Sequence, residues 1–135
     1  MYLSLLSNDK KHLFLDLEIH MSKTDGDFSV EEKAIIDTHC IEMHIDNNSY
    51  ECELPLEEVL SKISDEFTEQ EKRIVFLELT ATVLADNVYH TTEKVLVSKL
   101  ADILRISEDE SDVVLTLIKN LKDAYEGCAK FIKGV

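Results

Sequence analysis

The sequence predicts an all-α protein, a single-domain helical bundle of about six helices that spans residues 1–135. Two observations carry this prediction. The chain has only three glycines and one proline, and apolar residues recur three and four positions apart over the long stretches between turn signals. With 135 residues and 44% hydrophobic composition, the chain is long enough to bury the core of one domain.

The first helix should run from about Asn8 to Ser22. Leu13, Leu17 and Met21 recur every four residues and form an apolar stripe, which Phe14 widens. The segment "TDGDF" then ends the helix, because its glycine and aspartates are turn formers.

The second helix should begin after Ser29, because Ser29-Val-Glu-Glu32 is a capping box. In a capping box the hydroxyl and the glutamate carboxylate satisfy backbone N–H groups that the first helical turn leaves unpaired. We expect this helix to reach about Asp46, with an apolar side made of Ile35, Ile36, Ile41 and Ile45.

A polar loop, "DNNSYECEL", precedes the third helix, and Pro55 fits its first helical position. A second capping box, Thr68-Glu-Gln-Glu71, opens the fourth helix. The segment "IVFLELTATVLA" in this helix is apolar nearly all round, which predicts that it runs through the centre of the bundle.

The fifth helix should cover about Thr92 to Leu104, and a third capping box, Ser107-Glu-Asp-Glu110, opens a long last helix. Gly127 lowers the helix propensity of its final turns. The apolar residues of this last helix are Val113, Val114, Leu117, Leu121 and Phe131.

The charge of the chain restricts its partners. Lys and Arg number 14 against 28 Asp and Glu, a formal net charge of −14. Such a field repels phosphate backbones, so we expect no nucleic-acid partner. Residues 46–71 are strongly acidic, with Lys62 as their only basic residue. This run fits either an ordinary solvated face or a surface for a basic protein partner.

We also expect a cytoplasmic protein without membrane insertion. The longest apolar run, Ile74 to Ala85, is interrupted by Glu78 and is far shorter than the roughly 20 residues of a membrane span. The first residues lack a basic leader and a small-residue cleavage site. The three cysteines form no CxxC pair, which suits reduced thiols.

A repeat links two of the turns between helices. Shifted by 61 residues, "LEIHMSKTDGDFSVEEKAII" aligns with "LTATVLADNVYHTTEKVLV". Gly26 then falls on Asn87, and these are the residue types that most easily adopt a positive φ after a helix. The other aligned pairs are Asp25 with Asp86, Phe28 with Tyr89, Glu32 with Glu93 and Lys33 with Lys94.

This repeated Asp-Gly, aromatic and Glu pattern resembles the TerB-like family associated with tellurite resistance. "LTATVLADNVYHTTEKVLVSKLADILRISEDE" is similar to the second unit of that family and "SKTDGDFSVEEKAII" to its first, so the resemblance covers about residues 10–115. It implies an all-α bundle with internal pseudo-symmetry, a role in stress response and tellurite resistance, and interaction with a protein partner.

The resemblance further implies that acidic residues of both turns gather on one surface and bind a divalent metal. Asn87 and His90 depart from the family pattern in the second turn. Carboxylate oxygens are the ligands of Ca²⁺ and Mg²⁺, but this is no EF-hand, because Val30 occupies the position of its glycine. The candidate ligands are Asp25, Asp27, Glu32, Asp86 and Glu93. Helix capping and turn chemistry are the alternative explanation for these acids.

A competing hypothesis is a transition-metal handler or metalloenzyme. His12, Asp16 and His20 share one face of the first helix, and Cys40 and His44 lie four residues apart on the second. Ordinary core and surface positions are the favoured explanation for these residues, because helical spacing readily produces such coincidences. A third hypothesis is a pure protein-interaction scaffold.

Catalytic motifs are absent from the sequence. It contains no Glu-x-x-His, which argues against a carboxylate di-iron bundle, and no His-Glu-x-x-His zinc site. With glycines only at 26, 127 and 134, neither a P-loop nor a Rossmann fingerprint can occur. The sequence therefore predicts a non-enzyme.

Overall fold

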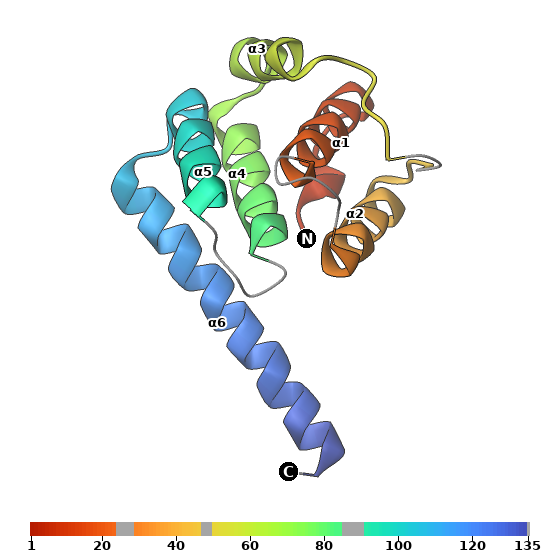
Figure 1. The fold of residues 1–135 in the computed structure, drawn as a ribbon, viewed down its shortest axis with the longest axis vertical. Coiled ribbons are helices and arrows are strands. Elements are labelled where there is room, and N and C mark those ends of the chain that lie inside the picture. Colours follow the sequence, from red (N-terminus) through yellow and green to blue (C-terminus); the bar gives the residue numbers. More distant parts are fainter. Residues whose placement is uncertain (24–28, 47–49, 85–90, 135) are drawn as a thin grey trace.

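The computed structural model describes residues 1–23, 29–46, 50–84 and 91–134, with the side chains of 91–93 left out. All regular elements within these ranges are helical, so the predicted all-α class is confirmed (Figure 1). The elements are the short 3-10 helix η1 (Leu3–Leu5) and the α-helices α1 (Asn8–Ser22), α2 (Val30–Met43), α3 (Leu56–Glu66), α4 (Glu69–Val83), α5 (Thr91–Leu104) and α6 (Glu108–Lys133).

The three predicted capping boxes are present and start α2, α4 and α6. In each, the hydroxyl accepts the backbone N–H of a glutamate whose carboxylate accepts the N–H of the capping residue, as in Ser29–Glu32, Thr68–Glu71 and Ser107–Glu110. Pro55, expected as the first residue of α3, instead precedes it as N-cap with φ −61° and ψ 150°.

The predicted repeat is reproduced in the helices. The start and end of α1 and α2 recur 61 residues later as the start and end of α4 and α5. The chain leaves α2 and α5 in the same way, because His44 and Arg105 both take the left-handed conformation, with φ of 57° and 59°. The N–H groups of Ile45 and Ile106 then reach back to carbonyls of the last helical turn, at 2.9 and 2.8 Å.

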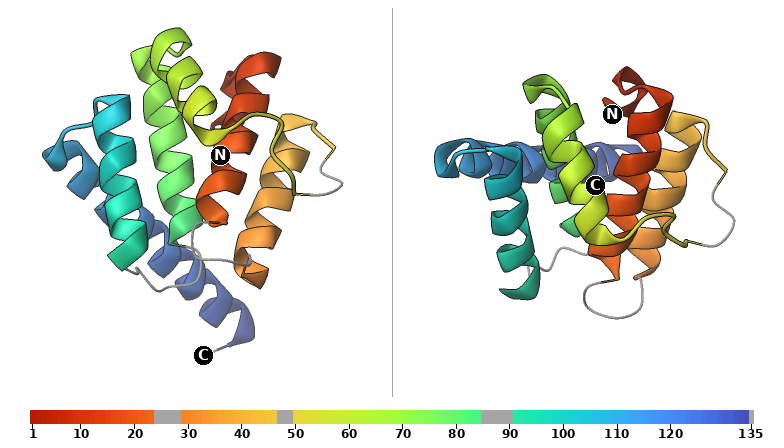
Figure 2. Two further views of the ribbon diagram at one scale, coloured as in Figure 1. Left: turned by 45° about the horizontal axis from the view of Figure 1, so that its top comes forward. Right: turned by 90° about the horizontal axis from the view of Figure 1, so that it is seen from above.

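The centre of the bundle holds two helices, although the sequence predicted only one. As expected, α4 is buried along most of its length, but α1 is buried on all sides from Leu13 to Ile19. Figure 2 shows α1 and α4 in the middle, with α2 and α5 outside them. The polar residues Asp16 and Glu18 give α1 the pattern of a half-exposed helix, yet both are buried.

The predicted apolar side of α2 is wrong in part. The helix ends at Met43 rather than near Asp46, and Ile41 is 76% exposed. The buried positions are Ile36, His39, Cys40 and Met43, which follow the i, i+3, i+4, i+7 pattern of one helical face. A histidine thus takes a core position that the sequence analysis gave to isoleucines.

The last helix, α6, differs from the others. It packs its first half on α4 and continues through Gly127 to Lys133. Its second half projects beyond the bundle (Figure 1). None of the helices in the described part of the chain has the length and apolar character needed to cross a membrane.

Candidate functional site

Most of the predicted cation ligands lie where the structure gives no description. Asp25, Asp27 and Asp86 are outside the described residues, and Glu93 is described only as backbone in the first turn of α5. The remaining candidate, Glu32, lies in the first turn of α2, where its Oε1 accepts the N–H of Ser29 at 3.0 Å.

The helix ends that flank the two turns lie at one end of the bundle. Figure 2 shows that α1 and α4 end there and that α2 and α5 begin there. The opposite end of α4 meets α3, because only Phe67 and Thr68 separate the two helices. The described helix ends on either side of residues 24–28 and 85–90 therefore lie at the same end of the bundle.

The histidine and aspartate face of α1 has a structural use. Both carboxylate oxygens of Asp16 accept backbone N–H groups, those of Glu53 at 3.1 Å and Leu54 at 3.2 Å. Nε2 of His20 donates to the Leu54 carbonyl at 2.9 Å, and His12 is exposed. This face therefore fixes the segment before α3 against α1.

The Cys40 and His44 pair of the transition-metal hypothesis is not arranged as a metal site either. Cys40 is core, and burial together with the nearby charges of Glu18 and Asp37 raises the pKa of its thiol to about 11, so it stays protonated. His44 has left the helix and is exposed. Throughout the described ranges, no three His, Cys, Asp or Glu side chains are placed to hold a metal ion.

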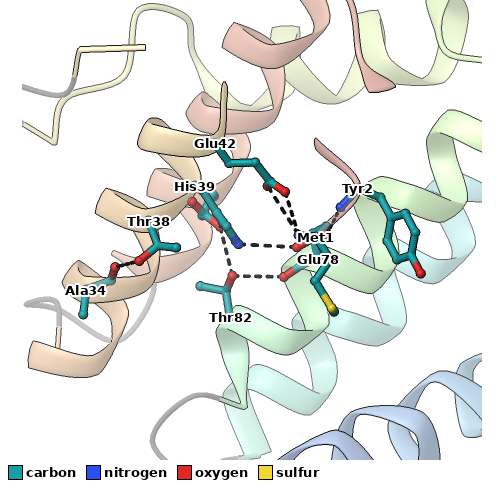
Figure 3. A network of polar contacts seen from close by, with 9 residues as sticks. Met1, Tyr2, Ala34, Thr38, His39, Glu42, Glu78 and Thr82 are labelled. Carbon is teal, nitrogen blue, oxygen red and sulfur yellow. Dashed lines mark hydrogen bonds and ion pairs between the residues drawn. The ribbon is translucent and has the colours of Figure 1, made fainter. Parts of the chain in front are cut away.

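The structure brings together a different set of polar residues, in the interior between α1, α2 and α4 (Figure 3). Nδ1 of His39 donates to Oε2 of Glu18 at 2.6 Å. The Thr82 hydroxyl lies 2.9 Å from the same oxygen and 3.0 Å from the backbone carbonyl of Glu78. On its other side, Nε2 of His39 lies 3.4 Å from Oε2 of Glu78.

Glu78 also holds the first residues of the chain. Its Oε1 accepts the amino group of Met1 at 2.7 Å and the backbone N–H of Tyr2 at 2.8 Å. The same amino group lies 3.1 Å from Oε1 of Glu42 on α2. The network thus links the segment before α1 to both α2 and α4.

His39 is a cation between two carboxylates. Burial by itself would lower the pKa of His39, but the hydrogen bonds to Glu18 and Glu78 outweigh burial and raise it to about 9. Burial would likewise raise the pKa of Glu78, but the hydrogen bonds from His39, Met1 and Tyr2 lower it to about 2. Near neutral pH His39 is therefore protonated and Glu78 is ionised.

This network is closed to substrates. Glu18 is 0%, Glu78 2% and His39 7% exposed. The two ring nitrogens of His39 point to different carboxylates, so they do not converge with carboxylate oxygens on one point. The arrangement holds α1, α2 and α4 together.

The sequence analysis missed this network, although the repeat contains a signal for it. At a shift of 61 residues, Glu18 falls on Leu79 and His39 falls on Leu100, and both leucines are buried. A polar pair at positions that are apolar in the second unit would have pointed to a buried ion pair.

An apolar groove lies elsewhere, between α4 and α6. It has a volume of about 380 Å³. Its apolar lining consists of Phe76, Leu77, Ile106, Val113, Val114 and Leu117, and Arg73, Asp109 and Glu110 complete it.

Comparisons with known proteins agree with this fold. A crystal structure of a tellurite resistance protein from Nostoc punctiforme superposes with a TM-score of 0.73, covering 96% of this chain and 84% of that one. The two sequences are 22% identical, so this likeness establishes the shared fold alone. A search of curated proteins returned no significant match.

The family model of the tellurite resistance protein TerB matches residues 47–115, more than half of the chain. The match contains Asp86 and Glu93 but begins after the first turn, whereas the repeat suggested a resemblance from about residue 10. The chain therefore belongs to the family of the tellurite resistance protein TerB.

Proposed function

We propose that this TerB-family protein is a non-enzymatic module of tellurite resistance and stress response that binds a divalent cation, Ca²⁺ or Mg²⁺. The binding surface is the end of the bundle where α1 and α4 end and α2 and α5 begin. The ligands are drawn from Asp25, Asp27, Glu32, Asp86 and Glu93. Its location is the cytoplasm, because free cysteines suit a reducing compartment.

The observation that carries this proposal is the shared position of the helix ends that flank both turns (Figure 2). Two acidic turns can supply the several oxygen ligands of a hard cation only if both lie at the same end of the bundle. The capping box uses Oε1 of Glu32, and the other carboxylate oxygen of Glu32 takes no part in the capping box. The net charge of −14 further favours cations near the surface.

The experiment is isothermal titration of the full chain with Ca²⁺, Mg²⁺ and Zn²⁺. We expect saturable heat with Ca²⁺ or Mg²⁺ in the wild type and its loss in Asp25→Asn/Asp86→Asn. The matched control is Asp65→Asn/Glu66→Gln, which also removes two negative charges, but from exposed positions at the end of α3, beside the start of α4. This control should titrate like the wild type.

Two results would end the cation part of the proposal. One is a wild type that gives no heat beyond that produced by monovalent salt of equal ionic strength. The other is an equal loss of heat in the control variant, because binding would then follow net charge rather than the two turns.

The tellurite part is tested separately by growth. A tellurite-sensitive bacterial host that expresses the wild type should survive higher tellurite concentrations than a host carrying an empty vector. Expression of Asp25→Asn/Asp86→Asn at an equal protein level should give less protection than the wild type. Equal survival with vector and wild type would contradict the role in resistance.

A further inference from the structure

The second half of α6 is an unusually exposed piece of helix. Every residue from 123 to 134 is exposed, and in Figure 1 this half extends away from the other helices. Three large apolar side chains lie on it, namely Tyr125, Phe131 and Ile132, with 71%, 85% and 82% of their surface exposed. An exposed apolar patch of this size marks an interaction site on a folded protein.

The apolar residues of α6 follow the spacing of a helix that packs against another helix. They alternate between steps of three and four, which is the a and d pattern of a heptad repeat. The residues in this stripe are Val114, Leu117, Leu121, Ala124, Cys128 and Phe131. Tyr125 and Ile132 lie next to the stripe, and their neighbour Ile118 in the first half is buried against the bundle.

The stripe is continuous with the groove between α4 and α6. Val114 and Leu117 belong both to the stripe and to the lining of the groove. One apolar surface therefore runs from the groove, where Leu77 of α4 is partly exposed, to the exposed Phe131 near the end of α6. An aromatic residue from a second helix could fill the groove at its start.

The two ends of α6 carry opposite charge. Glu108, Asp109 and Glu110 lie in its first turn, and Lys130 and Lys133 lie in its last turn. Two copies of this helix that run in opposite directions would therefore place acidic turns beside basic turns at both ends.

We propose that this stripe and groove are a self-association surface, on which two copies of the chain pair their α6 helices antiparallel about a two-fold axis near residues 122 and 123. The a and d positions then meet in matched layers. Val114 packs against Phe131 of the second copy, Leu117 against Cys128, and Leu121 against Ala124. Phe131 of each copy enters the groove between α4 and α6 of the other.

The size of the surface fits a dimer. Aromatic side chains bury about 150–250 Å² each, so the stripe with Tyr125, Phe131 and Ile132 offers an area on the order of the roughly 800 Å² per partner of a standard interface. A membrane fits less well. A helix that lies on anionic lipid carries a basic polar face, whereas here Asp123 and Glu126 are interspersed with the lysines and the whole chain carries −14.

Sedimentation equilibrium of the full chain tests this directly. We expect a concentration-dependent dimer in the wild type, weakened about 30-fold or more by Leu121→Glu or Phe131→Glu, the factor expected for losing an apolar hot spot. The control is Ile41→Glu, which places the same charge at an exposed isoleucine on α2 and should leave dimerisation unchanged. A wild type that stays monomeric at its highest attainable concentration overturns the proposal. Lipid-vesicle binding that Phe131→Glu abolishes would then assign the stripe to membranes instead.

Charge reversal tests the antiparallel direction. Lys130→Glu/Lys133→Glu should weaken its own dimer about 10-fold, because its last turns would meet the acidic first turns of the second copy. An equimolar mixture with Glu108→Lys/Asp109→Lys should restore dimerisation, since opposite charges then meet at both ends. A mixture that associates no better than either variant alone contradicts the antiparallel pairing.

A disulfide crosslink fixes the register. In the proposed pairing, Leu117→Cys faces the native Cys128 of the second copy, so mild oxidation should link the two chains of this variant covalently. In the wild type Cys128 faces Leu117, and the same treatment should leave the chains unlinked. Efficient crosslinking of wild-type chains through Cys128 would show a parallel pairing and overturn the proposed one.

Discussion

The two repeated units share their helices but differ in their interior. In the first unit, α1 and α2 meet through a hydrogen-bonded pair of ions, Glu18 and His39, whose atoms lie 2.6 Å apart. At the equivalent positions of the second unit, α4 and α5 carry the buried leucines Leu79 and Leu100. The helix bounds nevertheless agree to the residue at a shift of 61.

This difference shows that the helix framework does not depend on the chemistry of that one layer. The helix bounds and the left-handed conformations of His44 and Arg105 after α2 and α5 are the same in both units. A buried ion pair pays a desolvation cost that leucines do not. What the ion pair adds is a connection to Glu78, and through it to the segment before α1.

The largest effect is expected from breaking the pair on one side. His39→Leu leaves Glu18 and Glu78 as buried carboxylates without their shared cation, which should destabilise the fold by about 3–5 kcal/mol. Urea unfolding followed by circular dichroism measures this. Leu100→Val in the second unit is the apolar counterpart and should cost only about 1 kcal/mol. An equal cost of the two substitutions would contradict the ionised interior.

The next effect is a dependence of stability on pH that arises where His39 of the first unit meets Glu78 of α4. The folded-state pKa of His39 is raised from 6.5 to about 9, so its contribution is complete below pH 6.5 and is lost as the pH rises through 9. The loss should reach on the order of 3 kcal/mol. Glu78, with its pKa lowered from 4.5 to about 2, contributes fully above pH 4.5 and loses this contribution as the pH falls through 2.

Urea titrations between about pH 6 and pH 10 measure how the free energy of unfolding falls as the pH rises. His39→Leu should reduce the alkaline slope to the part that the Met1 amino group contributes, because, against the lowering effect of burial, Glu78 and Glu42 keep the pKa of that group raised. If His39→Leu keeps the full dependence of stability on pH, another group causes the loss of stability at alkaline pH.

A smaller effect should separate two neighbouring threonines of α4. Thr82 donates to Glu18, so Thr82→Val should cost about 1–3 kcal/mol. Thr80 is equally buried, but its hydroxyl has no hydrogen-bond partner among the described residues. Thr80→Val should therefore be neutral or slightly stabilising, by the same denaturation measurement. A larger loss of stability in Thr80→Val than in Thr82→Val would mean that Thr82 is not part of the network.

The smallest effect is expected where the first unit is converted to the second. Glu18→Leu/His39→Leu gives α1 and α2 the leucines of α4 and α5, and it removes Oε1 of Glu18, which has no partner in the described structure. Glu78 keeps the Met1 amino group and the Tyr2 N–H. The double variant should lie within about 1 kcal/mol of the wild type. A cost as large as that of His39→Leu alone would show that the layer requires the ions.

Much of the fold could be predicted from local signals. Ser29, Thr68 and Ser107 start their helices through contacts within four residues, so their effect is readable in the sequence. The site was less predictable. Pairing Cys40 with His44 assumed a continuous helix, but the helix ends at Met43 and His44 turns away.

The sequence by itself determined the helices, their order and the repeat, because capping, turn residues and apolar spacing act between near neighbours. Only the tertiary structure decided that α1 lies in the centre and that Glu18 and His39 meet Glu78, which is distant in the chain. It also decided that the apolar stripe of α6 faces outward. The physical reason is that amphipathic spacing shows which face of a helix is apolar, whereas the neighbouring helices decide what covers it.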